Sequence, residues 1–248
     1  MPDTITIDAK DMHYTPLNKK IREAVNDGAK EIIIENVLGQ RFIGNGLRGD
    51  DVEIKVKGVP GGDIAMFMSG PHVTVYGNCD HAPGNTMDAG VLVIHGSSGD
   101  ATAHSMRGGE VYVRDDIGYR GGIHMKAYHE KRPVLVVGGQ AKAFLGEYMA
   151  GGILIVLGMN QDFAVNERGI GSGIHGGMIF VRGDVDENLL GIGAKKEQAD
   201  MDDLKTIRIY IEKFADYFGF DSDEILKSGF TKIVPASARP FANKYCWE

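Results

Sequence analysis

Pairs of apolar residues two positions apart recur along most of the chain, at steps close to 19 residues. The pairs are Ile54 and Val56, Val73 and Val75, Leu92 and Ile94, Val111 and Val113, Leu135 and Val137, Leu154 and Val156, and Ile179 and Val181. Apolar residues at i and i+2 are typical of a strand with one buried face. A period near 19 residues leaves no room for a strand, a full helix and two turns. The pattern therefore predicts a solenoid in which each repeat is one coil of short strands.

Small residues and methionines recur in the same register as these pairs. A series of glycines with one aspartate follows the pairs: Gly39, Gly58, Gly77, Gly96, Asp115, Gly139, Gly158 and Gly183. A second series holds glycine and alanine: Gly46, Ala65, Gly84, Ala103, Gly122, Gly146 and Gly171. Three positions later stand Gly49, Met68, Met87, Met106, Met125, Met149 and Ile174. We expect glycines at the bends, and Asp115 fits because aspartate tolerates the left-handed backbone conformation better than most residues.

These series predict a mainly β protein, a parallel β-helix of about eight coils and roughly 40 Å in length, because stacked strands lie about 4.8 Å apart. Equivalent aliphatic and methionine side chains would then form internal columns. We interpret the methionine column as core packing rather than as a soft-metal path, since a flexible buried side chain at one recurring position needs no ligand. The runs 91–94 and 153–157 are apolar on both faces, which predicts that part of the outer face is covered.

Two segments are expected to cover the open ends of the solenoid domain, residues 31–193, where strand edges would otherwise be exposed. Residues 1–30 form the N-terminal cap, a strand followed by a helix with Thr15 as N-cap, an apolar stripe of Leu17, Ile21 and Val25, and an end at Gly28. Residues 194–248 form the C-terminal cap and tail. The helix there has the stripe Leu204, Ile207, Ile211, Phe214 and Phe218, ends at Gly219, and precedes a short helix near 223–227 and an irregular tail with Pro235, Pro240 and Trp247.

The composition and charge of the chain restrict the classes of partner and the cellular compartment that we expect. Of the 35 glycines, 32 lie between Gly39 and Gly193, so the excess belongs to the repeat. The formal charge of -7, without a long block of like charge, argues against nucleic acid and anionic membranes as partners. Neither a membrane-spanning run nor a leader pattern is present, which favours a cytoplasmic protein. Two cysteines, Cys79 and Cys246, are too few for a disulfide framework or a thiolate-bound cluster.

Two steps of 24 and 25 residues place insertions between Lys126 and Pro133 and between Met159 and Ile170. Both segments are polar or charged and interrupt a tight repeat, so they are either partner-contacting loops or ordinary solvated loops. The candidate partner contacts are Lys126, His129, Arg132, Asn160 and Arg168.

Motifs for catalysis and for cofactor binding do not fit this pattern. GxGxxG occurs at 44–49 and at 171–176, but a dinucleotide fingerprint needs a following helix, and a strand is expected after both. The eight histidines lack zinc-site spacing, no GxSxG elbow occurs, and the acidic residues do not form a column of paired carboxylates. We therefore expect no catalytic residue, no bound metal and no bound cofactor on this chain.

The repeat, the literal GxGxG at Gly169-Ile-Gly171-Ser-Gly173 and several phrases resemble the C-terminal domain of the glutamate synthase large subunit. The phrases are Asn36-Val-Leu-Gly-Gln-Arg-Phe42, Gly84-Asn-Thr-Met87, Met106-Arg-Gly-Gly109 and Gly146-Glu-Tyr-Met-Ala-Gly-Gly152. The chain most resembles the stand-alone form found where that enzyme is split into subunits, and its tail with Arg239-Pro240 also resembles that form. The resemblance implies a right-handed β-helix, the hand that the crossover rule favours.

The resemblance also implies a non-catalytic scaffold that braces a glutaminase subunit against an FMN and iron-sulfur synthase subunit, so that ammonia from glutamine reaches 2-oxoglutarate and glutamate forms. FMN and the cluster would lie on the partner, and a homo-oligomer is a further possibility. The β-helix subunits of formylmethanofuran dehydrogenase and of N-methylglutamate synthase resemble the same repeat and stay open as alternatives. A self-sufficient carbohydrate-active β-helix is the opposing class, and its stacked acidic cluster is missing from the sequence.

Overall fold

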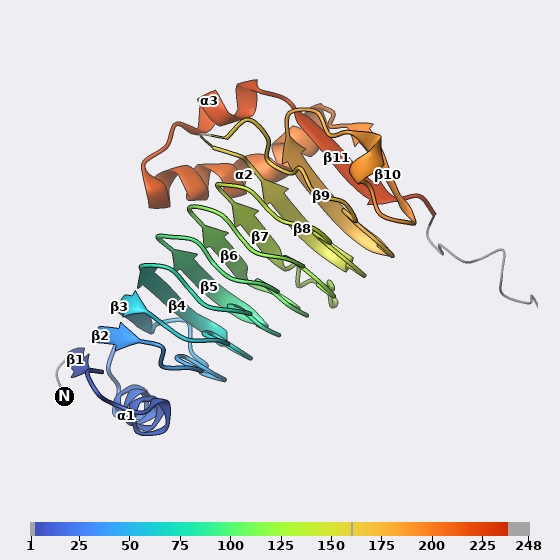
Figure 1. Ribbon diagram of the computed structural model, residues 1–248. Coiled ribbons are helices and arrows are strands. Elements are labelled where there is room, and N and C mark those ends of the chain that lie inside the picture. The colour runs from blue at the N-terminus through green and yellow to red at the C-terminus, as the bar shows by residue number, and fades with distance from the viewer. Residues whose placement is uncertain (1–2, 160, 238–248) are drawn as a thin grey trace, which may run out of the picture.

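One sheet of 11 strands runs the length of the molecule in the computed structural model, which describes residues 3–159 and 161–237 (Figure 1). The strands are β1 (Thr4–Asp8), β2 (Glu31–Leu38), β3 (Glu53–Val59), β4 (Ser69–Tyr76), β5 (Ala89–Ile94), β6 (Glu110–Val113), β7 (Val134–Val137), β8 (Ala150–Val156), β9 (Gly176–Arg182), β10 (Ala194–Gln198) and β11 (Phe230–Pro235). Strands β1–β9 are parallel neighbours in chain order. The predicted parallel β-solenoid is confirmed, with about seven turns.

Each coil contains a strand, a short bridge segment and a turn segment. The bridge segments pair in parallel from coil to coil, through Cys79, Ser98, Ile117, Ala141 and Val165. The turn segments, such as 101–106, follow the bridge segments and precede the next strand. We call their stacked surface the turn wall.

The interior of the solenoid is built from the columns that the repeat predicts. Both members of every apolar strand pair are buried, and the five methionines of the column are fully buried among them. Burying one such side chain contributes on the order of 1.5–3 kcal/mol. The methionines therefore act as flexible core packing between aliphatic columns.

The first coil is two residues longer than the sequence repeat suggests. Strand pairing sets Val37, not Gly39, beside Gly58, after a bulge between Ile34 and Val37. In the turn segment, the Leu47 N–H donates to the Gly44 carbonyl, as the Met68 N–H does to Ala65. Gly44 and Leu47 are therefore the residues equivalent to Ala65 and Met68. The alignment of Gly39, Gly46 and Gly49 with the two glycine series and the methionine column was wrong because this coil has two extra residues after its turn segment. Arg48 pairs with Ser69 and Glu53 pairs with His72, so five steps in this coil match three in the next.

The N-terminal end is covered by α1 (Tyr14–Asn26), whose buried residues Leu17, Ile21 and Ala24 join the solenoid core. The N-cap is His13 rather than Thr15, because the His13 ring nitrogen accepts the Thr15 N–H at 3.3 Å. Figure 1 shows α1 beside β1 and β2, as expected for a cap.

The C-terminal helix α2 (Met201–Phe218) lies elsewhere than the sequence suggested. It starts with a capping box of Asp200 and Asp203 and ends at left-handed Gly219, but it packs on the outer face of β5–β9 rather than over the end of the solenoid. The reason is that this face is apolar, with Val93, Val136, Ile155 and Phe180 among the residues that α2 and α3 (Ser222–Lys227) help to bury.

The antiparallel pair β10 and β11 ends the sheet instead, after a 3-10 turn, η1 (Glu187–Leu189). The predicted tail residues Arg239, Pro240 and Trp247 lie outside the described residues. Among the helices that the structure describes, none is long and apolar enough to cross a bilayer.

Candidate interaction surface

The turn wall has one backbone geometry in every coil. Three alternate residues have positive φ, for example Ala101 (58°), Ala103 (59°) and Ser105 (54°), and the GxGxG residues Gly169 (91°), Gly171 (65°) and Gly173 (67°) repeat it. The outer two donate their N–H groups to the next coil, and the middle one donates to the preceding coil, as in the bonds from Ala103 to Pro83 and from Ser105 to Ile123. The turn wall is therefore a hydrogen-bonded surface in a rare conformation.

The middle residue of each turn segment points into the solenoid, which explains the second series of small residues. A Cβ atom on Gly84, Gly122 or Gly146 would lie 2.9, 2.6 or 2.5 Å from Val111, Leu154 or Ile179 respectively. These contacts are with the aliphatic column of a later coil. Glycine is required here by space as well as by its left-handed backbone.

The glycine series that follows the apolar strand pairs is explained by a different structural constraint. Gly77, Gly96, Gly139 and Asp115 are absent from the residues with positive φ, so the expectation of a left-handed Asp115 was wrong. A Cβ on Gly77 would lie 2.3 Å from the Gly58 carbonyl oxygen, and one on Gly139 would lie 2.1 Å from Asp116 Oδ1. The close approach of the preceding coil selects glycine at these positions. Gly58, Gly158 and Gly183 do have positive φ.

Aromatic side chains lie over the first and third glycines of GxGxG. A Cβ on Gly169 would lie 2.6 Å from the Phe144 ring, and one on Gly173 would lie 2.6 Å from the Tyr148 ring. One coil earlier, the Arg120 guanidinium lies 4.9 Å from the Phe144 ring centroid, and the His124 ring stacks on Tyr148 at 5.3 Å. We call Arg120, His124, Phe144 and Tyr148 the aromatic patch.

The aromatic patch is exposed, with 47% of Tyr148 and 37% of Phe144 accessible. Lys142 lies 5.2 Å from the Tyr119 ring beside it. Rigid, exposed aromatic and arginine side chains are typical of the centre of protein interfaces. These residues were not among the contacts predicted from the sequence, although their positions two residues before and after the inward small residue mark them as outward-facing.

The first insertion forms a small hairpin beside the turn wall. Tyr128 and Lys131 exchange backbone hydrogen bonds of 3.1 and 3.0 Å, with His129 at positive φ between them. The Lys131 ammonium pairs with Asp88 of an earlier coil, so the hairpin is tied back along the solenoid. Lys126, His129 and Arg132 are exposed on it.

The second insertion contributes one candidate contact that can be placed. Arg168 is exposed, and its carbonyl accepts the N–H of Phe144, which puts it next to the aromatic patch. Asn160 lies outside the described residues.

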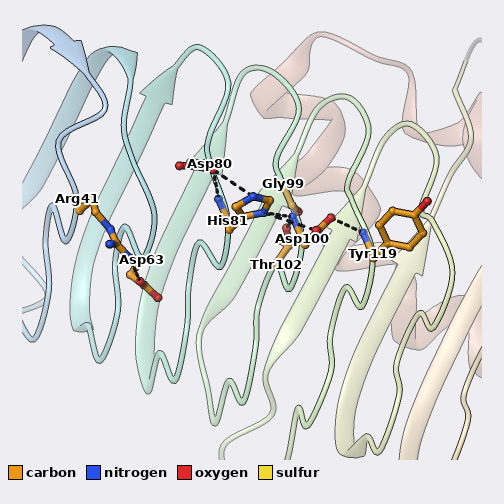
Figure 2. Close-up of polar contacts among 8 residues, drawn as sticks. All are labelled: Arg41, Asp63, Asp80, His81, Gly99, Asp100, Thr102 and Tyr119. Carbon is orange, nitrogen blue, oxygen red and sulfur yellow. Dashed lines mark hydrogen bonds and ion pairs between the residues drawn. The ribbon is translucent and has the colours of Figure 1, made fainter.

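Polar residues between the bridge and turn segments form a ladder that links the coils (Figure 2). His81 Nδ1 accepts the Asp100 N–H at 2.9 Å, and Asp100 Oδ1 accepts the Tyr119 N–H at 2.9 Å. The two ring nitrogens of His81 lie 3.8 Å from Asp100 and 3.6 Å from Asp80, and Arg41 pairs with Asp63 at 3.2 Å. Since His81 is an acceptor for the backbone, this cluster connects coils rather than forming a nucleophile–base pair.

Cys79 is the cysteine that the described part of the chain contains, and it is buried. Burial raises the pKa of the Cys79 thiol, which lies inside the bridge segments. Within residues 3–159 and 161–237, no three His, Cys, Asp or Glu side chains converge in a way that could hold a metal ion. Both GxGxxG segments lead into strands, β3 and β9, as the sequence predicted.

Fold and surface together define a β-solenoid protein with a hydrogen-bonded, aromatic-bearing turn wall. The model of the GXGXG motif family matches residues 15–237, and the chain belongs to this family, that of the C-terminal domain of the glutamate synthase large subunit. The uncharacterized protein MJ1350 of Methanocaldococcus jannaschii is 54% identical over 252 residues, which cover 98% of this chain and 97% of that protein.

Proposed function

We propose that this chain is a non-catalytic scaffold subunit of a glutamate synthase-type complex. It braces a glutaminase subunit against an FMN and iron-sulfur synthase subunit, so that ammonia released from glutamine reaches 2-oxoglutarate and is incorporated into glutamate. The observation that carries the proposal is the aromatic patch on a chain of this family. Phe144 and Tyr148 are held over Gly169 and Gly173 and still expose their rings.

The turn wall suits a scaffold because it is rigid before any partner binds. Its N–H groups are bonded to neighbouring coils, and its rings are stacked on Arg120 and His124. A partner that docks there orders few additional side chains, which lowers the entropic cost of association. The exposed cations Lys126 and Arg132 lie on the hairpin of the first insertion, and exposed Arg168 lies next to Phe144. These cations would interact with an acidic partner.

The proposal places FMN and the iron-sulfur cluster on the synthase partner. A cluster needs several thiolates, and this sequence has two cysteines, of which Cys79 is buried. This chain would supply position and contact surface, and the partners would supply the redox groups and the glutaminase nucleophile.

The experiment is to tag the chain at its native locus, purify it under gentle conditions and identify the co-eluting chains with the absorption spectrum of the eluate. Co-elution of a glutaminase-type chain and a yellow-brown FMN and iron-sulfur chain supports the proposal. A molybdenum- or tungsten-containing complex assigns the chain to the formylmethanofuran dehydrogenase type, and methylamine-dependent activity assigns it to N-methylglutamate synthase. A colourless lone protein contradicts the scaffold role and directs assays to an activity of its own, such as carbohydrate hydrolysis.

A further inference from the structure

Strand β1 is the edge of the sheet at the N-terminal end of the solenoid (Figure 1). It pairs with β2 on one side, and no strand of the described chain lies on its other side. The backbone groups that β2 uses follow from two bonds of 2.9 Å, from the Glu31 N–H to the Asp3 carbonyl and from the Ala9 N–H to the Glu35 carbonyl. These groups alternate in direction along a strand. The residues whose N–H and C=O groups point to the free edge are therefore Thr4, Thr6 and Asp8.

The two edges of the sheet differ in composition. Strand β10, the other edge, has the sequence Ala-Lys-Lys-Glu-Gln, and its charges oppose the approach of a further strand. Strand β1 has the sequence Thr-Ile-Thr-Ile-Asp, which contains no lysine or proline, and it pairs with β2 without a bulge. Thr6, at its centre, is exposed. An edge of β-branched residues that lacks these protective features is suited to the addition of another strand.

A groove of about 390 Å³ runs along the free edge of β1. One side is formed by residues 5–8, of which Ile7 is buried in the solenoid core. The other side is formed by one face of α1, since its lining residues are three, four and seven positions apart. These residues are Lys20, Glu23, Ala24 and Asp27. The groove therefore offers space for the inward side chains of an added strand.

The free edge of β1 is complementary to a second copy of itself. When two copies of β1 pair antiparallel about Thr6, each Thr6 exchanges both backbone hydrogen bonds with the other, as in a regular hydrogen-bonded pair. Thr4 of each copy then lies opposite Asp8 of the other, so no like charges face each other. On the inner face, Ile5 lies opposite Ile7, and both side chains point into the groove.

The same two-fold axis brings two copies of α1 together. Helix α1 connects the parallel neighbours β1 and β2, so it runs back antiparallel to both strands, beside which it lies in Figure 1. Strands are spaced by about 4.8 Å, so two adjacent β1–β2 pairs have their centres roughly 10 Å apart. Packed helices have axes about 8–10 Å apart. Pairing of the strands therefore places the two helices in contact.

The charges on α1 suit this contact. Lys20 precedes Glu23 and Asp27 on the helix face that lines the groove. The two-fold axis makes the two helices antiparallel, so the cation of each copy faces the carboxylates of the other. A parallel contact would instead place like charges together.

We propose that two copies of this chain associate through antiparallel pairing of β1 with β1, which joins their sheets into one and packs α1 against α1. The occupant of the groove is thus the β1 strand of a second copy. This junction lies at the N-terminal end of the solenoid, whereas the aromatic patch and the first insertion belong to coils after β6. The dimer therefore leaves those surfaces free, and the proposal does not depend on the scaffold function.

Sedimentation velocity of the purified full chain over a range of concentrations tests the proposal. We expect a dimer that dissociates on dilution. Thr6→Lys places two ammonium groups directly opposite each other, which should weaken the dimer about fivefold or more. Thr4→Lys is the matched control, because the same side chain on the same strand then faces Asp8 of the other copy, and it should retain the dimer. A native chain that is monomeric at every concentration would overturn the proposal, and so would equal effects of the two folded variants.

Cysteine cross-linking keeps the test independent of how Thr6→Lys folds. A hydrogen-bonded antiparallel pair has Cα atoms about 5.5 Å apart, which is within the range of a disulfide. Thr6→Cys in a Cys246→Ser background should therefore give a disulfide-linked dimer under mild oxidation, since the remaining Cys79 is buried. Thr4→Cys should not, because the two Thr4 residues are offset by roughly 13 Å along the pair. Failure of Thr6→Cys to cross-link, or equal cross-linking of Thr4→Cys, would contradict pairing about Thr6.

Discussion

The ring of Tyr148 lies on the backbone of Gly173 so closely that a methyl group there would come within 2.6 Å of the ring. Phe144 has the same relationship to Gly169. Two aromatic rings from the preceding coil thus pack on the outer glycines of GxGxG. The middle glycine, Gly171, faces Ala194 and Ile233 in the interior of the solenoid. The motif that identifies the family shapes the surface that we propose as its interface.

Gly173→Ala should destabilise the fold more than Gly46→Ala. The two glycines occupy equivalent outer positions of their turn segments, with φ of 67° and 63°, so both substitutions incur the left-handed penalty of about 1–2 kcal/mol. Nothing lies within 4 Å of a Cβ on Gly46, whereas Gly173→Ala must displace Tyr148 at a further cost of about 1–3 kcal/mol. Urea unfolding of both variants measures the difference.

Removing the ring should remove that additional cost. Tyr148→Ser combined with Gly173→Ala is expected to show a coupling that offsets the clash, since the two residues are in contact. Strict additivity of the two substitutions would contradict the assigned contact.

The interior of this fold was predictable because its residues repeat. Val73 and Val75 and the methionines from Met68 onward recur at a regular spacing because the equivalent positions are buried in each coil. The first coil was misaligned because its two extra residues lie between Arg48, which pairs with Ser69, and Glu53, which pairs with His72. This segment has no signature in the apolar spacing.

The features that occur once were harder to predict. Helix α2 was recognised from its apolar stripe, but the stripe does not say which surface of the solenoid it covers. Strand β10, with the sequence Ala-Lys-Lys-Glu-Gln, is a charged edge strand and lacks apolar alternation. The aromatic patch depends on contacts between residues of neighbouring coils that are 24 or 25 positions apart in the sequence, such as Phe144 and Gly169. Such contacts can be predicted only when the stacking register of the coils is known.

Gly122→Val should prevent stable folding. A Cβ at this position would lie 2.6 Å from Leu154 Cδ1 in a backbone with φ of 69°, and valine adds two further methyl groups. We expect a loss above about 3 kcal/mol, seen as a large drop in melting temperature or as insoluble protein. The milder Gly122→Ala, measured alone, with Leu154→Ala and beside Leu154→Ala alone, keeps the test interpretable, because the two substitutions together should destabilise the fold less than the sum of their separate costs. A Gly122→Val protein with an unchanged melting temperature would refute the inward placement.

Lys213→Met should loosen α2 from the sheet. The Lys213 ammonium contacts both carboxylate oxygens of Glu110 at 2.8 and 2.9 Å, and the buried Tyr112 hydroxyl donates to Glu110 at 2.6 Å. Losing the cation leaves a largely buried carboxylate with one donor, at a cost of about 1 kcal/mol because Lys213 is itself part-exposed. Limited proteolysis within α2 and urea unfolding should both report it. Lys205→Met, which removes an exposed pair with Asp202, is the control and should change neither.

Acid should weaken the packing of the last turn of α2. His72 packs edge-on against Tyr217, and His95 contacts Phe218. Burial lowers the pKa of both imidazoles below 6.5. At His95, the charge of Arg114 lowers the pKa further. At His72, the charges of Glu53 and Glu110 partly oppose the effect of burial, and the charge of Lys55 adds to it. Between the lowered pKa and 6.5 the unfolded chain binds protons that the folded chain excludes.

Stability should therefore be flat above about pH 7 and fall as the pH drops below 6.5. Unfolding free energies of the native chain and of His72→Gln with His95→Gln, measured from pH 8 to pH 5, isolate this contribution. The double variant should lose less stability over that range. Parallel pH profiles for the two proteins would exclude these histidines as the source.

Charge reversal on the first insertion should weaken assembly without unfolding the chain. Lys126 and Arg132 are exposed on the hairpin whose Lys131 is anchored to Asp88, so Lys126→Glu with Arg132→Glu leaves the anchor intact. If the partner surface is acidic, we expect binding to weaken about tenfold, or roughly 1.4 kcal/mol, with a smaller salt dependence than the native complex shows. Lys10→Glu with Lys20→Glu, near the N-terminal cap, makes the same change in net charge and should bind normally. Equal binding by both variants would leave the hairpin as a solvated loop and restrict the interface to the aromatic patch, which Phe144→Ser would then test.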